Sequence, residues 1–357
     1  MEDERAEKRR RVLAILDALE LEAVVLRDPA NIAWYGGGAR ARIVEGGDLG
    51  VFDIVVRRDG DEIATDEIEA PRLADEELTG FAGTFRVARW DEGREGLLPR
   101  GPRIGTDVPY EGAADVRDAL VRARQRLTPP EIERYARLGA DAAAAMTDAI
   151  LALTPAMSEW TAAGELAARL IQRGIVPVVL LAAGESRLGR YRHPLPTAAP
   201  LGRRGMLVVC GRRDGLIANL TRLFAFGPIE PEGAERYERL LRVEAAFLDA
   251  LRPGRSVGDV FRAGAAAYAA NGFDRDEWRR HHQGGPCGYA PRDAIATAAG
   301  EGPVDLAQAF AWNPSAAGIK VEDTVVTTPD GPALLTGDPR WPVIRVAGRD
   351  RPAILER

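Results

Sequence analysis

Hydrophobic residues at helical spacing open the chain. Within residues 6–20 the apolar positions recur every three or four residues, which predicts an amphipathic helix; they are Val12, Leu13, Ile15, Leu16 and Leu19. The apolar run at residues 22–26 predicts a buried strand. Two further β-rich segments, 51–56 and 63–65, flank a turn that contains Gly60, and this pattern predicts a hairpin.

A helix start near residue 128 divides the chain. Thr128 can cap a helix, Pro129 fits its first turn, and Glu131 follows three residues after the cap. The Ala-rich segment beyond it and the amphipathic segment 234–251 predict two long helices, whereas residues 98–102 predict a loop. A chain of 357 residues can form two domains, so we predict domains at residues 1–125 and 126–357.

The composition narrows the class of protein. An apolar share of 46% is ordinary for a globular protein, and a net charge of −6 gives no basic surface for nucleic acid. No apolar run reaches the roughly 18 residues of a membrane span, and the charged residues 1–11 do not begin a secretory signal. Cys210 and Cys287 do not suggest a disulfide scaffold. We therefore expect a cytoplasmic protein with neither a nucleic-acid nor a membrane partner.

The chain has three histidines, and they lie in two short motifs. His193 is followed by Pro194-Leu195-Pro196, and His281 is adjacent to His282. A histidine with a pKa of about 6.5 can accept a proton and then donate it. If residues 281–282 form a strand, their side chains point to opposite faces. We then expect His281 in a pocket and His282 at its rim or in a structural role.

The segment Asn219–Gly227 resembles a metal-binding strand of the creatinase, aminopeptidase P and prolidase superfamily, whose catalytic domain has the pita-bread fold. Four more segments match that superfamily in order: residues 206–211, 281–289, 310–314 and 321–325. The resemblance places the usual metal ligands at five positions: Val209 (with Val208 as the other alignment), Asn219, Gly285, Asn313 and Glu322. Only Glu322 retains a carboxylate, so we expect no metal and no cofactor.

The resemblance also implies the architecture. We expect an α+β protein with a creatinase-like N-terminal α/β domain, followed by a pita-bread domain whose curved antiparallel sheet is flanked by helices. A homodimer is implied as well, in which the segment Asn31–Tyr35 of one chain approaches the pocket of the other.

The implied function is metal-independent, creatinase-like hydrolysis of an amide or amidine C–N bond in a small polar molecule. His193 and His281 match catalytic histidines of creatinase, and Glu322 matches a substrate-binding glutamate that could hold a substrate cation or orient His281. The candidate substrate-binding residues are Asn219, Thr221, Asn313, Tyr289 and Arg222. Thr221 replaces a second glutamate, which makes creatine itself a doubtful substrate.

Each of these residues also has a structural interpretation. Arg222 could be the partner of a buried carboxylate such as Glu322 or Asp323, and the two asparagines could be relics that preserve the strand. Two other functions therefore stay open: a catalytically inactive pseudo-peptidase that acts as a binding module, and a metal-dependent Xaa-Pro peptidase with a rebuilt site.

Overall fold

The computed structural model describes residues 2–357, so Met1 lies outside the described residues. The chain forms two compact units: Met1–Pro130 with Asp214–Leu216, and Glu131–Arg213 with Ile217–Arg357. The α-helices are α1 (Glu2–Ala18), α2 (Pro29–Tyr35), α3 (Ala70–Arg72), α4 (Arg117–Gln125), α5 (Pro129–Ala152), α6 (Glu159–Ile171), α7 (Glu185–Leu188), α8 (Pro231–Ala250) and α9 (Val257–Ala270). Three shorter helical segments are η1 (Leu73–Glu77), η2 (Arg94–Leu97) and η3 (Glu277–Arg280).

The N-terminal unit is built on one mixed sheet. Its strands are β1 (Ala23–Leu26), β2 (Asp53–Arg57), β3 (Asp61–Asp66), β4 (Gly83–Ala88), β5 (Ile104–Thr106) and β6 (Ala114–Asp115), in the order β4-β3-β2-β1-β5-β6. Strand β1 pairs antiparallel with β2 and parallel with β5. All four β1 residues are buried, as expected for a central strand.

The second unit contains two four-stranded sheets, ordered β18-β9-β8-β7 and β10-β11-β14-β15. Their strands are β7 (Val176–Gly184), β8 (Arg204–Arg213), β9 (Leu216–Ala225), β10 (Gly284–Cys287), β11 (Ala309–Trp312), β14 (Asp323–Thr328), β15 (Gly331–Leu334) and β18 (Leu355–Glu356). Two hairpins complete the unit: β12 (Ser315–Ala316) with β13 (Ile319–Lys320), and β16 (Val343–Val346) with β17 (Arg349–Pro352).

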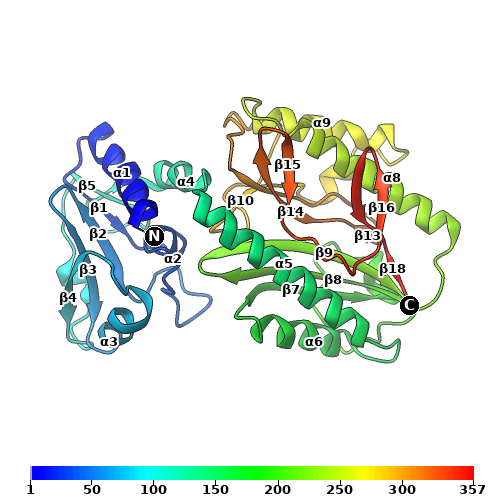
Figure 1. Cartoon of the computed structure of the whole chain (residues 1–357), viewed down its shortest axis with the longest axis horizontal. Helices are drawn as coiled ribbons and strands as arrows, with labels where there is room; N and C mark the ends of the chain where they lie inside the picture. The colour runs from blue at the N-terminus through cyan, green and yellow to red at the C-terminus, as the bar shows by residue number, and fades with distance from the viewer. Residues whose placement is uncertain (1) are drawn as a thin grey trace. The chain divides into compact units, whose positions relative to one another are not determined.

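Strand β9 links the two sheets. Thr221 forms an antiparallel bridge with Glu322, and the Thr221 N–H donates to the Glu322 carbonyl at 3.0 Å. The Asn219 N–H donates to Thr324 Oγ1 at 2.8 Å. Through these contacts the two sheets join at a bend into one hydrogen-bonded surface. Helices α6 and α8 pack on the outer side of that surface (Figure 1).

A buried ionic network fixes β14 against the C-terminal hairpin. Arg222 Nη2 donates to Asp323 Oδ1 at 2.8 Å, and Arg351 Nη2 donates to Asp323 Oδ2 at 2.7 Å. Arg351 Nε also donates to Glu244 Oε2 on α8 at 2.6 Å. Buried charges are tolerated when each is paired in this way.

Most of the elements predicted from periodicity are confirmed. Helix α1 extends beyond the predicted residues 6–20 at its start, and β2 and β3 form the predicted antiparallel hairpin. Helix α5 begins at Pro129, and α8 covers nearly all of residues 234–251. The two units divide after Pro130.

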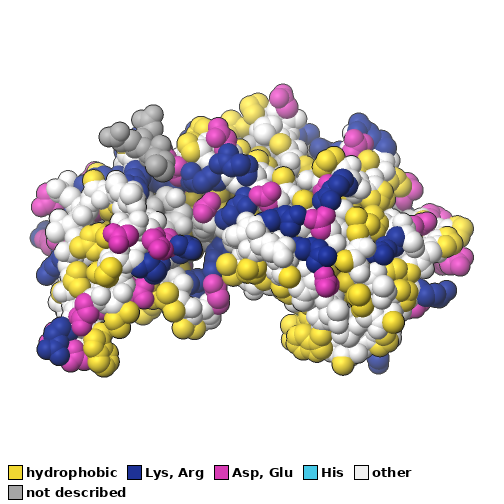
Figure 2. All heavy atoms as spheres, turned by 60° about the horizontal axis from the view of Figure 1, so that its bottom comes forward, with side chains coloured by type: hydrophobic (Ala, Val, Ile, Leu, Met, Phe, Trp, Pro, Cys, Tyr) yellow, Lys and Arg dark blue, Asp and Glu magenta, His cyan; other side chains and the backbone are white. Residues whose placement is uncertain are grey.

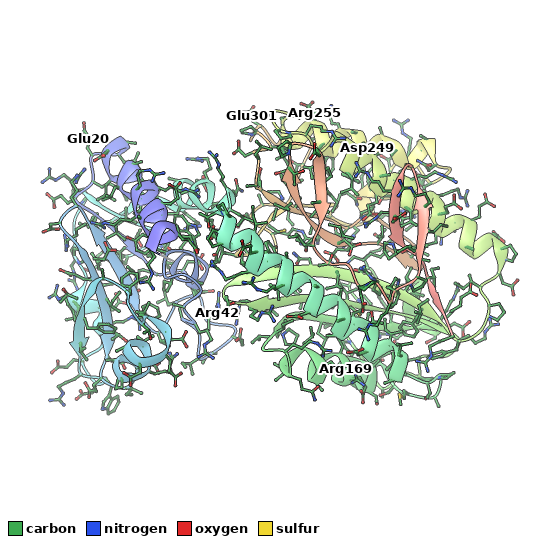
Figure 3. The ribbon with its side chains drawn as sticks, viewed as in Figure 1. Glu20, Arg42, Arg169, Asp249, Arg255 and Glu301 are labelled. Carbon is green, nitrogen blue, oxygen red and sulfur yellow. The ribbon has the colours of Figure 1, made fainter. Side chains whose placement is uncertain are left out.

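The surface carries interspersed charges of both signs over the face shown in Figure 2. On α8, Asp249 (Figure 3) accepts a hydrogen bond from Arg349 Nη2 of β17 at 2.8 Å. Within the described residues, no helix combines the length and apolar character needed to cross a membrane.

Candidate functional site

All three histidines of the chain lie in one cluster. His193 belongs to the loop between α7 and β8, whereas His281 and His282 connect η3 to β10. His281 Nε2 lies 3.0 Å from His193 Nε2, and the two rings meet edge to face with centroids 4.8 Å apart. One potential ligand nitrogen from each histidine lies within 4.8 Å of the others. We call His193, His281 and His282 the histidine cluster.

The rings of His281 and His282 do not point to opposite faces as expected, and His282 is half-buried. Its ring centroid lies 4.6 Å from that of His281 and 5.5 Å from that of His193. Alternation of side chains requires a regular strand, and β10 begins only at Gly284. Because residues 281–283 form an irregular connection, both histidines turn toward His193.

Hydrogen bonds hold His281 in place. Ser315 Oγ lies 3.1 Å from His281 Nδ1, and Gln283 Nε2 donates to the His281 carbonyl at 2.6 Å. The Tyr268 hydroxyl in turn donates to Gln283 Oε1 at 2.8 Å. His281, Gln283 and Ser315 are all buried, so this ring has little freedom to reorient.

The environment keeps the imidazoles neutral near pH 7. Burial, followed by the charge of Lys320, lowers the pKa of His281 to about 2. Burial and Arg292 lower the pKa of His282 to about 4. The pKa of His193 is also lowered, first by partial desolvation of its ring and then by the charge of Lys320. A neutral imidazole can accept a proton or coordinate a metal ion.

Glu322 lies near these charges and has its own partners. Arg292 Nη2 contacts Oε1 at 2.5 Å, Lys320 Nζ contacts Oε2 at 2.9 Å, and the Thr221 hydroxyl donates to Oε2 at 2.9 Å. Burial alone would raise the pKa of Glu322, but the two cations outweigh it and lower that pKa. Of the two roles expected for Glu322, orientation of His281 is not observed, because His281 Nδ1 faces Ser315 instead. Binding of a substrate cation stays a prediction.

The two asparagines differ from Tyr289 and Arg222 in the hydrogen bonding of their side chains. Asn219 and Asn313 are buried, and each has a side-chain oxygen without a hydrogen-bond partner among the described residues. Tyr289, by contrast, donates to Glu131 Oε1 at 2.6 Å, and Arg222 is held by Asp323 and the Thr336 carbonyl. The structural interpretation of Arg222 is therefore the one that its contacts support.

Sequence reasoning missed Lys320, Arg292 and Ser315. Lys320 carried a signal: the chain has only two lysines, and arginine supplies nearly all of its positive charge. Both lysines are buried in ion pairs. Arg292 and Ser315 carried no comparable signal, since they come from segments whose approach to Glu322 and His281 only the fold creates.

At the five positions where the resembled superfamily binds metal, the residues of this chain do not supply the carboxylates that would hold a pair of metal ions. Val209 is apolar, and both oxygens of Glu322 are already engaged by cations. At Gly285, φ is +147°, and a Cβ atom would lie 2.6 Å from the Ala294 carbonyl oxygen, so the backbone leaves no room for a ligand side chain. Asn219 and Asn313 offer one neutral oxygen each.

Comparison with solved structures shows which known proteins share this fold. The chain superposes on the prolidase of Pyrococcus horikoshii with a TM-score of 0.79 at 18% identity, covering 94% of this chain and 99% of that one. Dipeptidase PepE of Mycobacterium ulcerans gives 0.78 at 18% identity, covering 99% of each chain. These similarities confirm the predicted α+β architecture, an N-terminal domain followed by a pita-bread domain.

Sequence comparison agrees. The protein named "Putative dipeptidase YkvY" from Bacillus subtilis is 29% identical over 133 residues, a match that covers 36% of this chain and 36% of that relative. Residues 133–329 match the profile of metallopeptidase family M24. That match covers more than half of the sequence, and the chain therefore belongs to family M24.

Proposed function

We propose that the protein hydrolyses a C–N bond in a small, peptide-like molecule, with water activated at the histidine cluster. The observation that carries the proposal is the meeting of all three histidines beside Lys320, Arg292 and Glu322. Membership of family M24 supports hydrolysis of a peptide-like bond, and two of the similar proteins are named as a prolidase and a dipeptidase.

The proposed chemistry uses His193 as the group that meets water. Its side chain is exposed whereas that of His281 is buried, so His193 is the accessible end of the pair. A proton accepted there can pass to the departing nitrogen, and general acid-base catalysis of this kind contributes about 10²- to 10⁴-fold. The short contact with His281 Nε2 would hold the His193 ring and share its proton.

The charges favour a substrate that carries a carboxylate. Lys320 and Arg292 share the single carboxylate of Glu322, which leaves positive charge beside the histidine cluster. An amidine cation such as the guanidinium of creatine would be repelled there. We therefore favour an amino-acid amide or short peptide over a creatinase-like substrate.

The proposal does not use the metal pair that the family name implies, because the donors at the five positions do not fit it. The loss of those donors also favours a second candidate, a binding module without catalysis. The two candidates differ in whether substrate is turned over.

A substrate screen tests the proposal. Untagged protein is incubated with dipeptides, including Xaa-Pro pairs, with amino-acid amides and with creatine, and products are followed by mass spectrometry. We expect turnover of a carboxylate-bearing amide that His193→Ala abolishes. Gln172→Ala, which changes an exposed residue at the end of α6, should retain it. Binding of such a compound without turnover would support the binding module instead.

A further inference from the structure

We infer that the histidine cluster binds one divalent transition-metal ion, of the zinc, cobalt or nickel type. This site differs from the five positions discussed above, because none of its three side chains is among them. It would give the protein a metal centre that its sequence motifs do not predict. With the ion bound, His193 would be a ligand, and the ion rather than this imidazole would supply the activation of water.

The geometry suits three imidazole ligands. A zinc–nitrogen bond is about 2.0–2.1 Å long, so nitrogens of a tetrahedral site lie roughly 3.3–3.4 Å apart. His281 Nε2 and His193 Nε2 lie 3.0 Å apart, and the third ligand atom is within 4.8 Å of both. In the metal-free cluster one of the two imidazoles must donate a proton to the other, and an ion would replace that proton. His193 lies in a loop and is exposed, which allows the small outward shift that this exchange needs.

The hydrogen bonding around the histidines resembles that of metal-binding histidines. A metal-binding histidine usually uses its second ring nitrogen in a hydrogen bond that fixes the ring, and His281 does so through Nδ1 to Ser315 Oγ at 3.1 Å. His282 Nδ1 is buried and has no hydrogen-bond partner among the described residues. A buried polar atom left unpaired is costly unless something satisfies it, and a metal ion on the cluster is one way to do so.

The ligand type selects the metal. Imidazole nitrogen favours zinc, nickel, copper or cobalt, whereas magnesium and calcium prefer oxygen ligands. Three protein ligands leave at least one coordination position open, as in catalytic zinc sites. Exposure of His193 gives that position access to solvent.

The positive charge of Lys320 should weaken cation binding at the histidine cluster, and this effect can be tested. Its charge acts on both His193 and His281, and the carboxylate of Glu322, which it shares with Arg292, acts in the opposite sense. Removing the charge in Lys320→Met should therefore tighten metal binding at the cluster. An ion held elsewhere on the surface would not respond.

The experiment is a metal titration of protein made without a histidine tag and stripped with a chelator. Cobalt is added while the visible absorbance is recorded, and zinc is then used to displace it. We expect one ion per chain with a dissociation constant in the micromolar range or below. Because the chain has only three histidines, imidazole scattering in the X-ray absorption spectrum of the bound zinc can arise only from them.

Variants locate the ion. His282→Ala and His281→Ala should each weaken binding at least about tenfold, and Ser315→Ala should weaken it less. Asp276→Asn is the matched control, since it removes an exposed carboxylate but no imidazole and no buried charge. Absence of stoichiometric binding, or binding that is lost in Asp276→Asn and kept in His282→Ala, would overturn the inference. Both readouts are taken without substrate, so they are independent of the hydrolysis that we propose.

Discussion

His281 Nε2 lies 3.0 Å from His193 Nε2, although 88 residues separate the two histidines in the chain. The contact joins the loop before β8 to the connection before β10, and His282 completes the group.

His282→Ala should reduce turnover of the substrate about as strongly as His193→Ala, by roughly 10²- to 10⁴-fold. The reason is that all three rings are within contact of one another, so removal of either changes the same group. Steady-state rates of the two variants beside Gln172→Ala would check this. A His282→Ala protein with wild-type kcat and KM would show that this ring takes no part in catalysis.

Glu322→Gln should destabilise the second unit by about 3–5 kcal/mol at pH 7, because Lys320 and Arg292 would remain buried without their carboxylate. Urea unfolding monitored by tryptophan fluorescence measures the loss. As a control, Asp276→Asn removes an exposed ion pair with Arg279 and should change stability by no more than about 1 kcal/mol.

The same substitution should change how stability depends on pH. The pKa of Glu322 is lowered in the folded protein relative to about 4.3 in the unfolded chain. Its stabilising contribution is therefore complete above about pH 5 and is lost as the pH falls through and below the unfolded value. We expect the difference in unfolding free energy between wild type and Glu322→Gln to shrink between pH 5 and pH 3. A difference that stays constant over this range would contradict the pairing.

Gly285→Ala should destabilise the protein more than Gly288→Ala. Both glycines have positive φ, but an added Cβ at Gly285 would lie 2.6 Å from the Ala294 carbonyl oxygen, whereas Gly288 has open space. We expect a difference of about 1–3 kcal/mol in thermal or urea unfolding. For the same reason, Gly285→His should not create a new metal ligand, and metal titration of that variant would show no additional ion.

A homodimer remains a prediction from the family resemblance. Asn31, Trp34 and Tyr35 are buried within their own unit, so a partner would have to cover neighbouring exposed residues such as Ile43 and Val44. An obligate interface should bury on the order of 2,000 Å² or more. Sedimentation at micromolar concentration should give a dimeric mass that Ile43→Asp lowers, and a monomeric wild type would contradict the prediction.

The sequence by itself determined the fold and the loss of the family's metal ligands. The apolar spacing along α1 and α8, the capping residues before α5 and the turn around Gly60 act over a few residues, so they can be recognised without tertiary information. The ordered motifs from Asn219 to Glu322 identified the superfamily, and the comparisons confirm it. The residue types at Val209 and Gly285 already excluded the usual ligands.

Only the tertiary structure decided what surrounds the remaining polar groups. His282 joined the cluster because residues 281–283 do not form a strand, a backbone detail that alternation cannot anticipate. Both oxygens of Glu322 are paired because Arg292, 30 residues earlier in the chain, reaches it beside its near neighbour Lys320, and the Tyr289 hydroxyl donates to Glu131, 158 residues earlier. Such contacts depend on distances between segments far apart in the chain, which a linear pattern of residue types does not encode.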